Sequence, residues 1–390
     1  MFKTIQSCRN LKGQRVLLRV DFNVLDTQGR IESDFRLKAA IPSIKFLVSK
    51  GARVILTSHA GRPHGKDDPK YSLNSIGHRL SGLLGKPVKF APDCVGPKVK
   101  KMISGLKPGQ ILLLENLRFY KAEENNDSKF AGELAGLADI YVNDAFGVCH
   151  RANASVTAIT KKIPSYAGLL LQKEIKFFEH LRTSPKKPFL LVIGGAKAAD
   201  KLAVIKNLIN QVDRVLVGGA VSNTFLKATG RKIGGSLYEP DMVKQAGQIY
   251  KKYGNKISLP IDVMLATRPS GHQKGGRLAT IYKIKSDDAI LDIGPKTQAR
   301  YAKYLASAKT IFWAGPMGDF EVKNFAQGTL TIAQTLGKSK ANTVVGGGET
   351  ISAIENLGLL KKISHVSTGG GAALEFLAGW PMPGLKSLGY

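Results

Sequence analysis

The segment YAGLLLQKEIKFFEHLR, residues 166–182, predicts an amphipathic helix that divides the chain into two halves. Pro164 precedes it and Pro185 and Pro188 follow it, so both of its ends are marked by residues that interrupt helices. Short apolar runs alternate with helical patterns on either side. We therefore predict that this helix joins two domains. Apolar residues recur along it at spacings close to three and four, as on a helix with one buried face: Leu169, Leu170, Ile175, Phe177, Phe178 and Leu181.

The length of 390 residues is sufficient for two domains that each have a core. The first ten residues, MFKTIQSCRN, lack an apolar stretch and a small-residue cleavage site, which predicts no signal peptide at this start. The longest apolar runs, such as 111–114 and 189–193, are too short to cross a bilayer. Cys8, Cys94 and Cys149 show no CxxC or metal-binding spacing. This pattern favours reduced thiols in a cytoplasm.

The net charge of +29 comes from 58 Lys and Arg against 29 Asp and Glu. The excess is spread over both halves, and we interpret it as a chain-wide compositional feature that favours solubility. An anionic small substrate would account for only a few of these charges. Nucleic-acid binding is the alternative, but no RNA-binding motif or aromatic platform supports it. We expect neither a membrane nor a nucleic-acid partner.

The first half alternates between strand and helix, which favours a parallel, doubly wound sheet. Ser33 and Asp34 are expected to cap the first helix, and Gly51 is expected to end it. Strands are predicted at 15–20, 53–57, 88–90, 111–119 and 140–147, with helices at 33–51, from about 72, at 97–103 and at 129–137.

The second half repeats one pattern, an apolar run followed by glycine or proline and then by helical spacing. The runs are FLLVIGGAK (189–197), RVLVGGA (214–220), ISLPID (257–262), AILDIGP (289–295), TIFWAGP (310–316) and TVVGGGET (343–350). The predicted fold class is α/β, with two doubly wound, parallel, Rossmann-like sheets joined by a central helix and hinge. The predicted domains are 1–165 and 184–372, joined by the helix 166–183, with 373–390 packing back on the N-terminal domain.

In the first half, charged and polar residues follow the ends of the predicted strands. Ligands of open α/β sheets bind beyond these carboxyl ends, and guanidinium groups bind carboxylate and phosphate bidentately. We therefore predict a site for a small polyanion. Each residue alone also has a structural interpretation, such as a surface salt bridge, a structural histidine or a turn cap. The residues are Asp21, Asn23, His59, Arg62, Arg118, Asp144, His150 and Arg151, with Arg36 near a helix start.

In the second half, glycines follow the strand ends, at 194–195, 218–219, 294, 315, 346–348 and 369–371. Glycine lets backbone N–H groups approach a ligand, and a helix N-terminus favours phosphate. Lys197 and Lys201 are four residues apart, so both could face one ligand. Strand-to-helix turns use glycine for other reasons too, and neither GxxxxGK[ST] nor GxGxxG is present. The pattern predicts a phosphate-rich ligand without naming it.

Nine motifs occur in order along the whole chain: RVDFNV (19–24), SHAGRP (58–63), ENLRF (115–119), DAFG (144–147), HRA (150–152), GGAKAADK (194–201), WAGPMGDFE (313–321), GGGET (346–350) and HVSTGGGA (365–372). Together they resemble the phosphoglycerate kinase family. The resemblance implies reversible phosphoryl transfer between 1,3-bisphosphoglycerate and ADP, giving 3-phosphoglycerate and ATP. It also implies Mg²⁺ as the nucleotide complex, and a monomer.

The same resemblance implies the site residues. The first domain should bind the triose phosphate through Asp21, Phe22, Asn23, Arg36, His59, Ala60, Gly61, Arg62, Arg118, His150 and Arg151. The second should bind the nucleotide through Gly195, Lys197, Lys201, Gly219, Gly294, Glu321, Gly347, Gly348, Glu349 and Thr350. Arg36 and Lys197 are the expected catalytic residues, Glu321 is expected at the ribose and Glu349 at the metal. A carboxylate nucleophile is already ionised at neutral pH, so the reaction needs alignment and charge neutralisation but no general base.

Three positions depart from the family pattern. Leu25 stands where the family usually has proline, Ala314 where it has asparagine, and Glu349 where it has aspartate. Because the last two belong to the nucleotide side, we expect altered nucleotide or metal affinity. They also leave open a second interpretation, a catalytically weak relative retained for binding.

Overall fold

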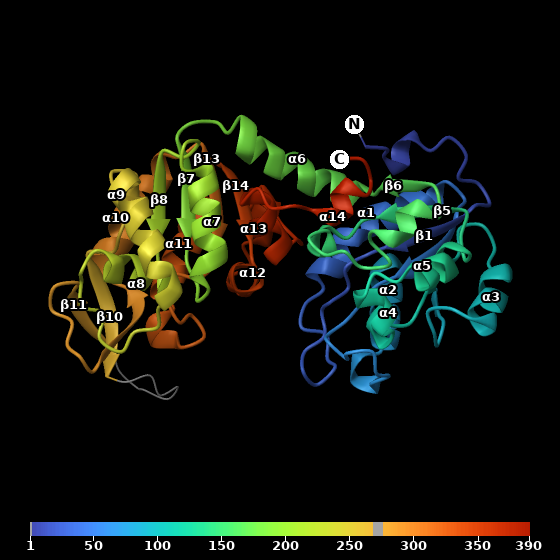
Figure 1. The fold of residues 1–390 in the computed structure, drawn as a ribbon, viewed down its shortest axis with the longest axis horizontal. Helices are drawn as coiled ribbons and strands as arrows, with labels where there is room; N and C mark the ends of the chain where they lie inside the picture. Colours follow the sequence, from blue (N-terminus) through green and yellow to red (C-terminus); the bar gives the residue numbers. More distant parts are fainter. Residues whose placement is uncertain (1, 268–275) are drawn as a thin grey trace. The chain divides into compact units, whose positions relative to one another are not determined.

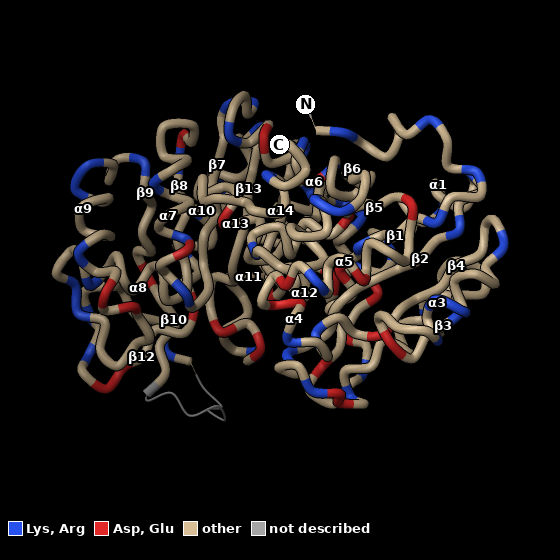
Figure 2. The backbone as a smooth tube through the Cα atoms, turned by 45° about the vertical axis from the view of Figure 1, so that its right-hand side comes forward, with Lys and Arg blue, Asp and Glu red and all other residues tan. Residues whose placement is uncertain are grey.

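The computed structural model describes residues 2–267 and 276–390. The chain forms two compact units, which we call unit 1, Met1–Lys176 with Pro381–Tyr390, and unit 2, Phe177–Trp380. Each unit is built on a parallel sheet covered by helices (Figure 1). Lys and Arg occur along the chain in both units rather than in one block (Figure 2). Among the described residues, none of the helices combines the length and apolar character needed to cross a membrane.

Unit 1 contains a six-stranded sheet in the order β3-β4-β2-β1-β5-β6, and every neighbouring pair is parallel. The prediction of a parallel sheet here is confirmed. The last strand was not predicted, because its residues were assigned to the start of the joining helix. The strands are β1 (Arg15–Arg19), β2 (Arg53–Thr57), β3 (Val88–Phe90), β4 (Ile111–Leu113), β5 (Ile140–Asn143) and β6 (Ser165–Ala167).

Helices cover both faces of this sheet. Along β1, Val16 and Leu18 belong to one core and Leu17 belongs to the other, as the two-residue strand period requires. The first core is completed by α1 (Phe35–Ser49) and α2 (Asn74–Leu84), and the second by α3 (Pro97–Ser104) and α5 (Ser128–Ala135). The short helices α4 (Lys121–Glu124) and α14 (Pro383–Lys386) complete the unit.

The start of α1 differs from the prediction in one respect. Asp34 occupies the N-cap position, but its side chain makes no capping hydrogen bond. Its carboxylate instead accepts two hydrogen bonds from Arg79, with Nε–Oδ1 at 2.8 Å and Nη2–Oδ2 at 2.5 Å. Ser33 Oγ accepts the Phe35 N–H at 3.1 Å. A bidentate arginine is the stronger partner for the carboxylate, and sequence spacing does not reveal it.

Unit 2 contains a second six-stranded parallel sheet in the order β15-β14-β13-β7-β8-β9. Its strands are β7 (Phe189–Ile193), β8 (Arg214–Val217), β9 (Ile257–Ser258), β13 (Thr310–Ala314), β14 (Asn342–Gly346) and β15 (His365–Val366). Its helices are α7 (Ala198–Leu208), α8 (Gly219–Ala228), α9 (Val243–Tyr253), α10 (Pro295–Ser307), α11 (Gln327–Lys338), α12 (Gly348–Asn356) and α13 (Gly371–Leu377). The core on one face of this sheet draws on α10, α11 and α12.

A three-stranded antiparallel sheet adjoins the parallel one, in the order β11-β10-β12. It consists of β10 (Asp262–Thr267), β11 (Arg277–Thr280) and β12 (Asp288–Ile293). The prediction that the run at 257–262 leads into a helix, and the placement of 289–295 in the parallel sheet, were therefore wrong. Apolar content and a following glycine are the same for both kinds of strand, and the pairing partner lies elsewhere in the sequence.

The joining helix is α6 (Leu169–Thr183), and the division between the units falls within it. It starts three residues later than predicted because β6 occupies 165–167. In unit 1, Ser43 Oγ accepts the Leu169 N–H at 3.2 Å and Asp144 Oδ1 accepts the Leu171 N–H at 3.0 Å. In unit 2, the Phe177 ring stacks on His365 at 4.3 Å between centroids.

The chain's last ten residues belong to unit 1. The Gly384 N–H donates to the Cys149 carbonyl at 2.9 Å, and Ser387 Oγ donates to the Val156 carbonyl at 3.2 Å. The connections between elements also contain 3-10 helices at Ile5–Ser7, Pro69–Tyr71, Leu117–Phe119, Phe146–Val148, Ala158–Lys161, Pro240–Met242, Lys323–Phe325 and Leu360–Lys362.

Candidate active site

Arg36 is held at the sheet edge of unit 1 by the residues that follow β1. Its Nη1 lies 3.0 Å from Asp21 Oδ1 and 3.3 Å from the Asn23 carbonyl oxygen. Asn23 Oδ1 accepts the Gly61 N–H at 2.8 Å, which ties the end of β1 to the loop after β2. Asp21 and Asn23 therefore position an arginine and a loop, beyond any role in the local turn.

Arg118 is the most deeply buried of the predicted arginines, at 5% exposed. Its Nη1 donates to the Gly61 carbonyl at 2.6 Å, and its Nε lies 3.4 Å from Glu124 Oε1. Burial lowers the pKa of Arg118, and Glu124 opposes that change. Asn116, which we had not assigned to the site, accepts the N–H groups of Ala60 and Arg118 at 3.2 and 3.0 Å. Its position within the ENLRF motif (115–119) is the sequence feature that could have identified Asn116 as a site residue.

His59 is an uncharged imidazole among guanidinium groups. Burial, followed by the charges of Arg118, Arg19, Arg36 and Arg151, holds its pKa well below the usual value. Arg19 Nη2 lies 3.2 Å from His59 Nδ1. Because a guanidinium only donates, Nδ1 accepts and the ring proton sits on Nε2. The sequence pattern assigns the buried Arg19 only to a strand, although this residue begins the RVDFNV motif (19–24), because its contact with His59 depends on the fold.

The remaining predicted residues of unit 1 differ in accessibility. Arg151 Nε donates to His150 Nε2 at 3.0 Å, and burial, with Arg151 second, lowers the pKa of His150 to about 4. Arg62 is exposed, with no hydrogen bond or ion pair to the rest of the described chain. The side chains of Phe22 and Ala60 are fully buried, so they present no surface to a ligand. Asp144 is also buried and holds α6, as described above.

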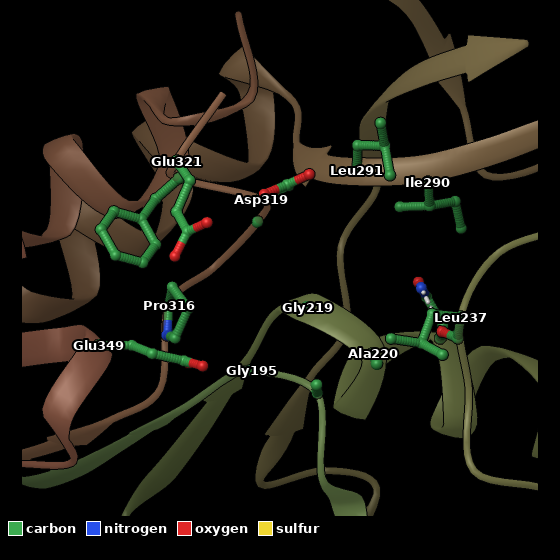
Figure 3. Close-up of a pocket in the computed structure, with 14 residues that line it drawn as sticks. Gly195, Gly219, Ala220, Leu237, Ile290, Leu291, Pro316, Asp319, Glu321 and Glu349 are labelled. Carbon is green, nitrogen blue, oxygen red and sulfur yellow. Dashed lines mark hydrogen bonds between the residues drawn. The ribbon is translucent and has the colours of Figure 1, made fainter. Parts of the chain in front are cut away.

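In unit 2, the strand exits surround a pocket of about 390 Å³ (Figure 3). Four of the predicted nucleotide residues line it: Gly195, Gly219, Glu321 and Glu349. Apolar residues outside every motif line it as well: Leu237, Ile290 and Leu291. Sequence reasoning missed these three because they are ordinary apolar side chains from distant parts of the chain. It also missed Asn223 and Asp319, which line the same pocket.

Two of the glycines serve close packing of strand exits. A Cβ on Gly194 would overlap the Pro316 carbonyl group, and one on Gly219, whose φ is +56°, would lie 2.7 Å from the Gly195 nitrogen. The N–H groups of Gly195 and Gly219 donate to the carbonyls of Pro316 and Met317 at 2.7 and 2.8 Å. The expectation that these glycines offer free N–H groups to phosphate is therefore wrong.

Helix α12 offers free N–H groups. Gly347 is its N-cap residue, and within the described ranges no acceptor is assigned to the N–H groups of residues 348–350. Thr350 Oγ1 accepts the Gly315 N–H at 2.7 Å, which ties this turn to the exit of β13. By contrast, the Ala198 and Ala199 N–H groups at the start of α7 both donate to Glu239 Oε2, at 2.5 and 2.7 Å. The geometry favours α12 for an anion.

Lys197 and Lys201 lie at the start of α7. Lys197 is exposed, whereas burial lowers the pKa of Lys201 and the charges of Asp200, Glu349 and Glu239 oppose that change. Gly294 is the N-cap residue of α10 and packs against Asp262, and it does not line the pocket. Ala314 is 1% exposed and does not line it either.

Among the described residues, the charged groups that line the pocket are all carboxylates: Asp319, Glu321 and Glu349, all exposed. Nowhere in the described part of the chain do three His, Cys, Asp or Glu residues form a group that could hold a metal. Mg²⁺ usually takes one or two carboxylates and leaves its other positions to water and substrate phosphates. The pocket fits a metal that arrives with a phosphorylated ligand, and it offers no cage for a permanent ion.

Comparison with known proteins identifies the family of the chain. A family model described as phosphoglycerate kinase matches residues 5–380. The phosphoglycerate kinases of Pelotomaculum thermopropionicum and Dictyoglomus turgidum are 46% and 48% identical over 389 and 392 residues, with 99% of this chain and 98% of each relative covered.

Solved structures give the same result. Phosphoglycerate kinase from Coxiella burnetii has a TM-score of 0.85 at 39% identity, covering 100% of this chain and 99% of that one. The enzyme from Pyrococcus horikoshii has a TM-score of 0.89 at 33% identity, covering 100% and 98%. The chain belongs to the phosphoglycerate kinase family over essentially its whole length, and it is a phosphotransferase with a carboxyl group as acceptor.

Proposed function

We propose that unit 1 binds the phosphorylated three-carbon acid, that unit 2 binds the nucleotide, and that the transfer is direct. The family reaction is reversible phosphoryl transfer between 1,3-bisphosphoglycerate and ADP, which gives 3-phosphoglycerate and ATP. The observation that carries the assignment is the contrast between the two sites. One gathers arginines around an uncharged histidine, and the other combines an apolar slot with a free helix N-terminus.

The cluster in unit 1 suits a small anion. Arg36, Arg118 and Arg151 all lie close enough to His59 to lower its pKa. Arg36 and Arg118 are already oriented by hydrogen bonds to Asp21 and Gly61, so little side-chain freedom would be lost on binding. The Nε2–H of His59 would add a neutral donor without adding charge.

The pocket of unit 2 suggests an orientation for the nucleotide. Leu237, Ile290 and Leu291 lie on one side of it, and Pro316 and Glu349 lie on the other (Figure 3). We place the base against the three apolar residues, and the phosphates near the start of α12, with Lys197 and Lys201. This orientation places the Glu321 carboxylate next to the ribose, whose hydroxyl groups need acceptors.

The chemistry asks for no proton acceptor. The attacking group is a carboxylate, and both candidate histidines have lowered pKa values, so neither supplies a charge. Arg36 and Lys197 would neutralise charge on the transferring group, a role whose loss typically costs about 100- to 1,000-fold in rate. Mg²⁺ bound with the nucleotide would supply further neutralisation of the phosphates, with Glu349 as the candidate protein ligand.

Direct transfer requires both ligands to share one water-excluded space, so we also propose that the units close during the reaction. Small-angle scattering with neither ligand, with each one and with both tests this proposal. The expected result is a smaller radius of gyration only with both ligands. An unchanged radius would contradict closure.

A coupled assay for ATP-dependent turnover of 3-phosphoglycerate tests the main proposal. We expect turnover by the unmodified chain and a rate about 100-fold lower for Lys197→Ala. Lys251→Ala, which removes an exposed lysine from α9, is the matched control and should keep full activity. An unreduced rate in Lys197→Ala would contradict the assigned role. The absence of turnover in the unmodified chain would favour the second candidate, a binding protein, which rests on Ala314 and Glu349.

Two further proposals concern the setting. We propose that the chain acts in the cytoplasm, in keeping with three cysteines that form no disulfide in the described structure. We also propose that it acts as a monomer. Sedimentation equilibrium should give a mass close to 42.1 kDa, and a dimer mass would contradict the proposal.

A further inference from the structure

Asn223 places a buried hydrogen-bond acceptor at the apolar side of the unit 2 pocket. It lies in α8, lines the pocket, and is only 2% exposed. Its Oδ1 atom is buried and has no hydrogen-bond partner among residues 2–267 and 276–390. Buried polar atoms without partners are rare in native proteins, so this one needs an explanation.

The orientation of the amide is fixed by its other end. Asn223 Nδ2 donates to the Leu237 carbonyl at 2.9 Å. A carbonyl oxygen only accepts, so the NH₂ group must face Leu237, and a flipped amide would oppose two acceptors. The end of the Asn223 amide that has no partner in the described structure is therefore the oxygen Oδ1, which can only accept a hydrogen bond.

The described residues around Asn223 Oδ1 offer it no hydrogen-bond donor. The pocket residues on that side are Ala220, Leu237, Ile290 and Leu291, whose side chains carry no donor. Asp319, whose N–H donates to the Leu291 carbonyl at 2.7 Å, brings another acceptor. A ligand group that satisfies this side of the pocket must be a donor attached to a flat apolar body.

We propose that Asn223 is a specificity residue that accepts a hydrogen bond from the exocyclic amine of the nucleotide base, and so favours a 6-aminopurine. This rests on the nucleotide site proposed above. A purine without the amine would leave Oδ1 unsatisfied, and a 6-oxopurine would place an acceptor against it. The phosphates, which lie on the other side of the pocket, would bind equally well in all three cases.

The test compares ATP with purine riboside 5′-triphosphate, which lacks only the amine, and with inosine triphosphate. We expect kcat/KM to favour ATP about ten-fold over purine riboside triphosphate, the range for one neutral hydrogen bond. In Asn223→Leu, of similar size but without the acceptor, the ratio should fall to within about two-fold. The ratio is taken within each variant, so a general loss of activity cancels.

Asp319→Asn is the matched variant, because it changes the other acceptor on this side of the pocket. It should keep the ten-fold ratio. If Asp319→Asn removed the preference for ATP and Asn223→Leu kept it, Asp319 would be the residue that recognises the amine, and the inference would be overturned. Equal use of ATP and purine riboside triphosphate by the unmodified chain would also overturn it, since a water would then satisfy Oδ1. Failure to turn over any nucleotide would instead count against the proposed function, so the two failures are distinguishable.

Discussion

The two candidate sites differ in the sign of the charged side chains that form them. In unit 1, cations are fixed in place before any ligand arrives, with Arg36 held by Asp21 and Arg118 by the Gly61 carbonyl and Glu124. In unit 2, the pocket is lined by carboxylates, and no lysine or arginine of the described part of the chain lines it. The first site can therefore attract an anion by itself. The second needs a cation brought by its ligand, together with the start of α12 and the lysines of α7. We expect nucleotide binding, but not binding of the three-carbon acid, to depend strongly on Mg²⁺.

The largest expected effect concerns Arg36. Arg36→Ala should lower kcat about 1,000-fold, because charge neutralisation is lost and Asp21 is left without its partner. Arg36→Lys should recover only part of the rate, since lysine lacks the planar fork. Steady-state assays of both variants measure this. Lys100→Ala, an exposed residue of α3, is the control. If Arg36→Lys were as active as the unmodified chain, a positive charge alone would be sufficient at this position. The fixed orientation of the Arg36 guanidinium would then not be what distinguishes the site in unit 1.

The next effect tests whether the glycines of unit 2 serve packing. Gly194→Ala should destabilise unit 2 by about 3 kcal/mol, because its Cβ would meet the backbone of Pro316. Chemical denaturation measures this. In Gly82→Ala, at an exposed position of α2, a Cβ meets no atom within 4 Å, and the helix should gain about 0.5–1 kcal/mol. A Gly194→Ala protein of normal stability that fails to bind nucleotide would restore the phosphate role for this glycine.

A smaller effect concerns a buried acid that packs against Gly318, a residue that lines the pocket. Asp292 is 1% exposed and accepts the Gly328 and Ile293 N–H groups at 2.7 and 2.8 Å. Burial raises its pKa to about 7. Between about pH 4 and 7 the folded state then holds a proton that the unfolded state has released, so stability falls as pH rises through this window.

We expect this slope to be on the order of 1 kcal/mol per pH unit. Denaturation of the unmodified chain and Asp292→Asn at several pH values isolates it, because the contributions of other groups cancel in the difference. Asp144 in unit 1, whose pKa burial raises to about 6, should show the same sign over a narrower window in Asp144→Asn. Parallel stability curves for the unmodified chain and Asp292→Asn would mean that the acid is ionised in both states.

These tests also mark what the sequence alone could reveal. Alternation of strand and helix predicted both parallel sheets, because period and length are local properties. It could not predict that β12 pairs with β10, since pairing depends on segments distant in sequence. The family resemblance implied roles for Arg36 and Glu349, but the contacts of Arg19 and Asn223 depend on neighbours that only the fold brings together. Glycine was correctly predicted at the strand exits, but the sequence could not separate its two roles there: Gly195 and Gly219 allow close packing, whereas Gly348 at the start of α12 has an N–H that is free in the described structure.

The smallest expected effect concerns Glu349. Its Oε2 lies 3.7 Å from the position of a Cβ on Gly195, so the carboxylate reaches the glycine turn of β7. Glu349→Asp withdraws the charge by one methylene. It should raise the Mg²⁺ concentration for half-maximal activity about two- to five-fold, with little change in kcat at saturating Mg²⁺. Glu349→Gln, which removes the charge, should raise it further. Calorimetric titration of Mn²⁺ with ADP present gives the same ranking without turnover. Unchanged metal dependence in both variants would separate Glu349 from the metal, and unit 2 would then depend on α12 and the lysines alone.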